Sequence, residues 1–158
     1  MIIVDSREKP KAIKSILSYF DKQGIGYRVS KLIVGDYQRF DNPAVAIDRK
    51  KDIQEWANCC TTDKERFIRE MGLAQELGVK LYVLITQNTI DGGAIKALSD
   101  LMLWRSKYSH INSERIYRVS AYWENKHGIK ILFCDKRQAG AVICELLNVD
   151  MKERKKTK

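Results

Sequence analysis

The sequence predicts a single α/β domain in which a central mixed β-sheet is flanked by helices. Its length of 158 residues fits one domain, since domains commonly run to roughly 100–200 residues. A hydrophobic fraction of 44% and a charged fraction of 31% are typical of a soluble protein with a real core. Short strand-like runs come first and then alternate with helical segments, in the order β-α-β-β-β-α-β-α-α-β-α.

The N-terminal third supplies most of the expected strands. Residues 1–5 form a short apolar run with a charged end. Residues 13–20 carry apolar side chains at the i, i+3, i+4, i+7 spacing of an amphipathic helix. Residues 25–34 alternate enough for a strand, and the runs 36–40 and 44–48 predict two more, joined by an Asn-Pro turn.

The middle of the chain predicts a helix followed by a central strand. Thr62 and Glu65 have the spacing of a capping box, and Gly78 suits the residue that follows a helix. A helix is therefore expected over 61–78. The apolar run 80–85 has the length of a buried strand.

Four further elements are expected to complete the domain. Helices are predicted over 90–108 and 113–128, and the second stops at a glycine. A strand is predicted over 129–134 and a closing helix over 137–147.

Charge and cysteine content limit the classes of function. The net charge of +9 favours a polyanionic partner. Part of it lies in residues 151–158, which we expect to form a basic, disordered tail after a domain of residues 1–150. No apolar run reaches the roughly 20 residues of a membrane span. The four cysteines form no C-x-x-C pair, which favours reduced thiols in the cytoplasm over a zinc site.

A charged segment at the end of one predicted strand carries the candidate chemistry. Side chains alternate across a strand, so Asp48 and Lys50 are expected on one face and Arg49 on the other. A carboxylate there can bind a hard divalent cation such as Mg²⁺, and an ammonium beside it can orient a water and stabilise charge on a phosphate. Asp36 is the natural second acid, because its strand turns back into that of Asp48.

Two more acids extend the cluster. Asp5 and Glu8 leave the end of the first strand and are expected to converge on the same place. Together the acids would suit metal-dependent phosphodiester hydrolysis. Each motif alone also has a simpler explanation, since a D-x-K run can be a solvated strand end, Asp36 a turn residue and Asp5 a cap.

The ordered set VDSRE (4–8), VGDY (34–37), AIDRKK (46–51) and RF (66–67) resembles the nuclease domain of the xeroderma pigmentosum group F (XPF) family of structure-selective DNA endonucleases. The resemblance covers the N-terminal half closely and the C-terminal third more loosely. It implies a single restriction-endonuclease-like domain with a PD-(D/E)xK core.

The resemblance also implies a role for seven residues. The metal, Mg²⁺ or Mn²⁺, would be bound by Asp36, Asp48 and Asp5. The catalytic lysine would be Lys50. The site would be completed by Arg49, Arg7 and Glu8.

Two positions depart from the family pattern. The usual glutamate of the E-R-K run is Asp48 here, one methylene shorter. The family's last aspartate falls at Gln54, close to Asp52 and Glu55, and neither acid is assigned to that role. The chain has no counterpart of the helicase region or of the tandem helix-hairpin-helix module, so it resembles the short forms of phages and prokaryotes.

We therefore expect a metal-dependent DNA endonuclease that is selective for branched, flapped or nicked DNA and acts in repair, recombination or replication. A catalytically silent module of the same fold, which binds DNA or positions a partner, is the alternative. A basic interaction protein with no nucleic-acid role is the third interpretation.

Basic side chains are expected to contact phosphate without reading sequence. The candidates are Lys9, Lys11, Lys14, Arg39, Lys51, Lys64, Arg69, Arg105, Lys107 and Arg115. Trp104 and Tyr108 lie among them and are typical of a stacking platform for single-stranded DNA, although Trp104 also fits a core position. The C-terminal half is expected to offer the face for a homodimer or heterodimer.

Overall fold

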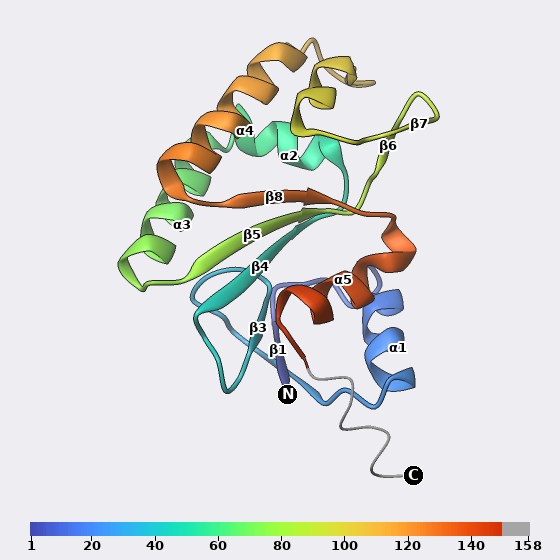
Figure 1. Cartoon of the computed structure of the whole chain (residues 1–158), viewed down its shortest axis with the longest axis vertical. Helices are drawn as coiled ribbons and strands as arrows, with labels where there is room; N and C mark the ends of the chain where they lie inside the picture. Colours follow the sequence, from blue (N-terminus) through green and yellow to red (C-terminus); the bar gives the residue numbers. More distant parts are fainter. Residues whose placement is uncertain (150–158) are drawn as a thin grey trace.

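The computed structural model describes residues 1–149 and contains a six-stranded mixed sheet with helices on both faces (Figure 1). The predicted α/β class is confirmed. The predicted disordered tail lies outside the described residues. The strand order is β2-β1-β3-β4-β5-β8, and the strands are β1 (Ile2–Asp5), β2 (Tyr27–Ser30), β3 (Tyr37–Arg39), β4 (Val45–Lys50), β5 (Lys80–Ile85) and β8 (Lys130–Phe133).

The direction of β3 decides where the strand ends meet. β3 is antiparallel to both β1 and β4, with Tyr37 opposite Val4 on one side and Ile47 on the other. β4, β5 and β8 run parallel, as do β1 and β2. The start of β3 therefore lies between the C-terminal ends of β1 and β4.

Helices cover the two faces of the sheet in two groups (Figure 1). One face packs against α2 (Ile53–Cys60), α3 (Lys64–Glu76) and α4 (Ser113–His127). The other packs against α1 (Lys14–Lys22) and α5 (Ala139–Leu146), which follows a 3-10 turn, η2 (Lys136–Gln138). None of the helices within residues 1–149 combines the length and apolarity needed to cross a bilayer.

Each face has its own apolar core. Ala46 of β4 belongs to the core under α2–α4, and its neighbour Ile47 belongs to the core under α1 and α5, as strand alternation requires. The first core centres on the rings of Trp56, Phe67 and Trp123, whose centroids lie 5.2–5.8 Å apart. Such aromatic contacts add stability beyond area burial.

The predicted helix over 90–108 is wrong. The segment forms a small hairpin of β6 (Thr89–Ile90) and β7 (Gly93–Ala94), followed by a 3-10 helix, η1 (Leu98–Leu103). Asp91 and Gly92 both have positive φ, 48° and 78°, and an Asp-Gly pair of this kind favours a two-residue hairpin turn over continued helix.

The region before β5 contains two helices where one was expected. Asp52, at the end of the charged run, caps the unpredicted α2 by accepting a hydrogen bond from the N–H of Glu55. The capping box expected at Thr62 is wrong, because its hydroxyl donates back to the carbonyl of Asn58 in α2. Asp63 stands at the N-cap position of α3 instead.

The remaining predicted elements are confirmed with shifted ends. The strand expected over 25–34 is limited to β2. The helix over 113–128 is α4, which Asn112 caps through its side chain and which ends at Gly128 in the left-handed conformation. The predicted closing helix is η2 followed by α5.

We predict that Gly140→Ala destabilises the protein by about 1–3 kcal/mol, as overpacking of a core contact does. Gly140 lies where α5 packs on α1, and a Cβ there would come within 2.8 Å of the Cβ of Tyr19. Equilibrium urea unfolding measures the change.

Gly72→Ala is the matched control. Gly72 lies inside α3, and among residues 1–149 no atom beyond its own helix backbone and chain neighbours lies within 4 Å of an added Cβ. Alanine should therefore stabilise by up to about 1 kcal/mol. If both substitutions stabilise the protein, α1 and α5 do not pack as closely as described.

Candidate active site

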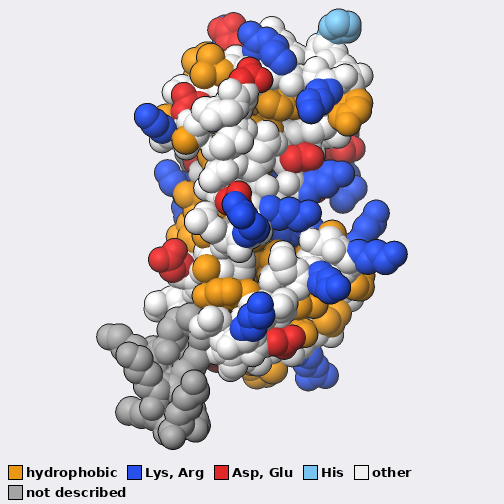
Figure 2. Space-filling view, turned by 90° about the vertical axis from the view of Figure 1, so that its right-hand side faces the viewer, with side chains coloured by type: hydrophobic (Ala, Val, Ile, Leu, Met, Phe, Trp, Pro, Cys, Tyr) orange, Lys and Arg blue, Asp and Glu red, His pale blue; other side chains and the backbone are white. Residues whose placement is uncertain are grey.

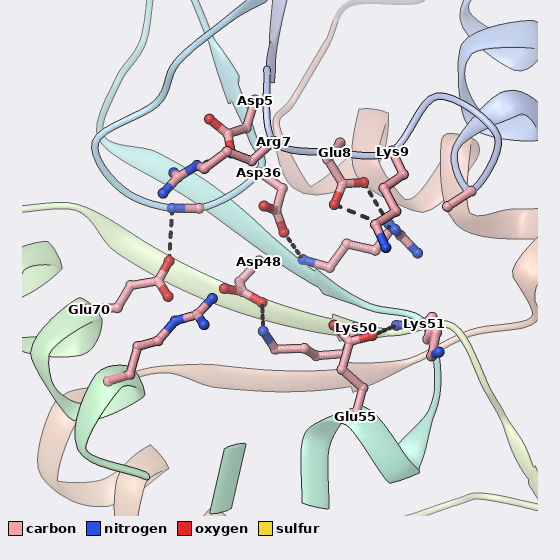
Figure 3. Close-up of a pocket in the computed structure, with 14 residues that line it drawn as sticks. Asp5, Arg7, Glu8, Lys9, Asp36, Asp48, Lys50, Lys51, Glu55 and Glu70 are labelled. Carbon is pink, nitrogen blue, oxygen red and sulfur yellow. Dashed lines mark hydrogen bonds and ion pairs between the residues drawn. The ribbon is translucent and has the colours of Figure 1, made fainter. Parts of the chain in front are cut away.

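A cavity of about 530 Å³ opens where the ends of β1 and β4 meet the start of β3 (Figure 3). All seven predicted site residues line it. Its lining is formed by Asp5, Arg7, Glu8, Lys9, Ala12, Gly35, Asp36, Asp48, Arg49, Lys50, Lys51, Glu55, Arg66 and Glu70.

Asp36 is held by the backbone of β4. Its N–H donates to the carbonyl of Ile47 over 2.7 Å, and its Oδ2 accepts from the N–H of Arg49 over 2.7 Å. Gly35 before it has φ +75°, and a Cβ there would lie 3.0 Å from the Ile47 oxygen. Only glycine allows the chain to bend this closely to β4.

Asp48 and Lys50 project from β4 on the face that carries α2 and α3. Lys50 Nζ lies 2.8 Å from Asp48 Oδ1 as an ion pair, and Nζ also lies 5.5 Å from the ring centroid of Phe67. Burial alone would lower the pKa of Lys50, but the charge of Asp48 outweighs it and the pKa is raised. Lys50 therefore stays charged at neutral pH.

Arg49 points to the opposite face of β4, as alternation predicts. Its Nε lies 2.8 Å from Glu8 Oε2, which also accepts from the hydroxyl of Tyr37 over 3.0 Å. Burial alone would lower the pKa of Arg49, but the carboxylate of Glu8 reverses that effect and raises it. Glu8 thus fixes the Arg49 guanidinium at the wall of the cavity.

Asp5 is fully enclosed and both of its oxygens are engaged. Oδ2 accepts from Arg7 Nε over 2.7 Å, and Oδ1 accepts from the N–H of Leu32 over 2.8 Å. Arg7 also donates to the Leu32 carbonyl over 3.1 Å. Asp5 thus joins the end of β1 to the loop before β3 and orients Arg7.

The structure adds one acid that sequence reasoning missed. Glu70 reaches the cavity from α3, and its Oε1 accepts from the N–H of Gly35 over 3.1 Å. Burial, with the charge of Asp48, raises the pKa of Glu70 to about 7. Helical spacing could have revealed it, because Glu70 follows Arg66 by four residues and both lie on the cavity side of α3.

Burial also raises the pKa of Asp36 well above its usual range, and the charges of Asp48 and Glu8 add to the effect. The only hydrogen bond to the Asp36 carboxylate within residues 1–149 comes from a backbone N–H, that of Arg49. Oδ1 of Asp48 forms an ion pair with Lys50. Within residues 1–149 it accepts no hydrogen bond.

The carboxylate oxygens of the cavity are suitable ligands for a hard divalent cation. Mg²⁺ and Mn²⁺ prefer carboxylate oxygens, and Asp36 and Asp48 present such oxygens to one cavity. Over residues 1–149 no set of three acidic, histidine or cysteine side chains is already arranged around a metal position.

Gln54 and Glu55, near the position of the last aspartate in the XPF pattern, have different surroundings. Gln54 accepts from the hydroxyl of Ser106 over 2.6 Å and donates to Asn58, and it is not among the cavity residues. Glu55 does line the cavity and accepts from the N–H of Lys51 over 3.3 Å. The acid in this corner is thus Glu55.

Of the basic residues predicted to contact DNA, two lie at the cavity. Lys9 and Lys51 line the cavity and are exposed, and Arg66 joins them. Lysine and arginine side chains gather around a hollow about half-way up the face seen in Figure 2. Trp104 is only 8% exposed and belongs to the core, so the stacking platform is wrong for that residue; Tyr108 is 85% exposed.

No family model and no curated protein matches the sequence. Solved structures do match the fold. XPF from Aeropyrum pernix superposes with a TM-score of 0.67 at 16% identity, over 98% of this chain and 68% of that chain. XPF from Aeropyrum pernix in complex with DNA superposes with a TM-score of 0.67 at 15% identity, over 96% and 65%.

The chain has an XPF-type nuclease fold. Because the superposition spans nearly the whole chain, the XPF-type fold includes the C-terminal third, which the sequence motifs matched only loosely. The chain spans about two thirds of the length of the matched XPF chains.

We predict that the metal-free protein loses stability as the pH rises through about 7. Folding raises the pKa of Glu70 from 4.5 to about 7, so its contribution is fully present below pH 4.5 and is lost above 7. The loss is up to about 3 kcal/mol, since one pKa unit corresponds to about 1.4 kcal/mol.

Urea unfolding at about pH 5 and pH 8, with a chelator present, measures this loss for the wild type and Glu70→Gln. The variant cannot titrate at this position, so its stability should fall less over the same pH range. Equal losses in the two proteins would show that Glu70 keeps its ordinary pKa.

Proposed function

We propose that this protein is a metal-dependent DNA endonuclease that hydrolyses phosphodiester bonds in branched, flapped or nicked DNA. The observation that supports this most is the convergence of Asp36, Asp48 and Lys50 on one cavity of an XPF-type fold. The DNA-bound state of the matched XPF supports DNA as the partner.

In this proposal Asp36 and Asp48 hold Mg²⁺ or Mn²⁺, and Asp5 supports them from the end of β1. When bound, the cation supplies an activated water and stabilises the leaving oxygen. Asp36 is better placed than Asp5 to bind the cation. One Asp36 oxygen accepts from the N–H of Arg49, and no hydrogen bond to the other is present within residues 1–149. Asp5 is already engaged by Arg7 and Leu32.

Lys50 acts as a charged hydrogen-bond donor to the attacking water or to a phosphate oxygen. Its raised pKa favours this role over that of a base, because a base must be deprotonated at working pH. Arg49, held by Glu8, and Arg7, held by Asp5, place two more positive charges at the cavity wall, where they would stabilise phosphate charge.

The DNA backbone would pass over the exposed basic residues at the cavity mouth, Lys9, Lys51 and Arg66. A homodimer or heterodimer through the C-terminal half is part of the same proposal.

We predict that Asp36→Asn lowers the cleavage rate by about 10²-fold or more, because the metal loses a charged ligand that supplies several kcal/mol. Asparagine can still accept from the N–H of Arg49, so the fold should persist. The measurement is cleavage of labelled forked, flapped, nicked and linear duplexes with Mg²⁺ or Mn²⁺.

Asp21→Asn, an exposed acid on α1, is the matched control and should cleave like the wild type. If the wild type and Asp21→Asn cut branched DNA and Asp36→Asn does not, the result supports the proposed endonuclease activity. Metal-dependent cutting that survives in Asp36→Asn contradicts the site. DNA binding without cutting by any of the three proteins favours the silent module of the same fold, with the short Asp48 as the first suspect.

We predict that Lys9→Ala and Lys51→Ala each reduce the slope of log Kobs against log[salt] for DNA binding by about 1, as expected for the loss of one phosphate contact. Lys126→Ala is the control. Lys126 lies in the last turn of α4, beside the start of β8, and the cavity lies at the other end of the parallel strands, where β4 ends. The slope is measured by fluorescence anisotropy with labelled duplex. If the salt slope of all three variants equals that of the wild type, the DNA does not contact Lys9 or Lys51.

A further inference from the structure

The bend that carries Asp36 to the cavity is fixed by contacts from three directions. The carbonyl of Asp36 accepts from the N–H of Asp5 over 2.8 Å, and its N–H donates to Ile47 in β4. These two bonds tie Asp36 to the neighbouring strands. The N–H of Gly35 is the third group of the bend, and it points away from β4, toward α3.

The partner of that N–H is the side chain of Glu70, 3.1 Å away. This is a side-chain contact across 35 positions of sequence, from a helix to the loop before β3. Figure 3 shows Glu70 reaching the bend from the α3 side, next to Asp48. Without Glu70 the N–H of Gly35 would depend on water in a cavity crowded with acids, and an unmet backbone donor costs about 1–3 kcal/mol.

Glu70 itself is well anchored. Phe67 and Met71, its neighbours on α3, are 3% and 1% exposed and pack in the core below α2–α4. A helix that is fixed by core packing gives its side chains a rigid base from which to bind another group. The helix thus transmits the packing of the core to the Gly35–Asp36 bend.

We propose that Glu70 is a positioning residue of the candidate active site, which places the Asp36 carboxylate by accepting the backbone N–H of Gly35. This inference rests on the proposed nuclease function for its role in cleavage. Its role in placing Asp36 can be tested without cleavage. The interaction needs an acceptor oxygen at this place and does not need a negative charge.

Glu70→Gln and Glu70→Ala separate these requirements. Glutamine keeps the acceptor oxygen and removes the charge, whereas alanine removes both. Glu76→Ala, an exposed acid on the same helix, is the matched control. Circular dichroism and urea unfolding of each full-length variant establish that it is folded.

The first readouts are the affinity for Mn²⁺ alone by titration calorimetry and the amide exchange rate of Gly35. Glu70→Ala should weaken Mn²⁺ binding by about 10–100-fold, the usual effect of losing a residue that orients a metal ligand, and should speed Gly35 exchange. Glu70→Gln should stay within about threefold of the wild type in both, and Glu76→Ala should match it.

The second readout is cleavage of flapped DNA at saturating metal. Glu70→Ala should lower kcat by about 10–100-fold with little change in KM, and Glu70→Gln should restore most of that loss. An effect of Glu70→Gln on Mn²⁺ affinity as large as that of Glu70→Ala would overturn the proposal, because the charge itself would then be required. Unchanged Mn²⁺ affinity and an unchanged Gly35 exchange rate in Glu70→Ala would also overturn the proposal.

The two proposals fail separately. If the wild type cuts no DNA, the endonuclease proposal fails, while Gly35 exchange and Mn²⁺ affinity still test Glu70. If the wild type cuts and Glu70→Ala cuts equally well, the endonuclease stands and the positioning role is wrong.

Discussion

The close contact between the Gly35–Asp36 bend and the end of β4 is the constraint on which the candidate site depends. Strand β3 can start beside β4 only because Gly35 has no Cβ to meet the Ile47 oxygen. That contact brings a carboxylate from one strand next to Asp48 on another. A side chain at Gly35 would push Asp36 away from the N–H of Arg49 and separate the two acids.

Strand alternation then distributes the charges over two layers. Asp48 and Lys50 form an ion pair on the side of α2 and α3, and Arg49 pairs with Glu8 on the other side. Charges that lose their hydration need such partners, since an unpaired buried charge costs several kcal/mol. The sheet edge can therefore carry many ionic groups without unfolding. Within residues 1–149, Asp36 and Glu70 accept hydrogen bonds from backbone N–H groups rather than forming such ion pairs.

Much of this arrangement could be predicted from the sequence, because it depends on periodicities that local rules describe well. The period of two in β4 separates Arg49 from its neighbours, and the cap at Asn112 with Gly128 bounds α4. Glu70 was missed because its role depends on a contact across 35 residues. The hairpin at Asp91-Gly92 was missed because the helix predicted over 90–108 ran through a two-residue turn signal.

The surroundings of Lys50 decide what kind of group it can be. Its ammonium faces Asp48 and lies over the face of Phe67, and both a carboxylate and the negative face of an aromatic ring favour the charged form. Burial opposes this but does not prevail. A lysine that must lose its proton to act would need an apolar pocket or a second cation, as buried lysines with low pKa have. Strand β4 supplies the opposite environment, which favours the charged ammonium form of Lys50.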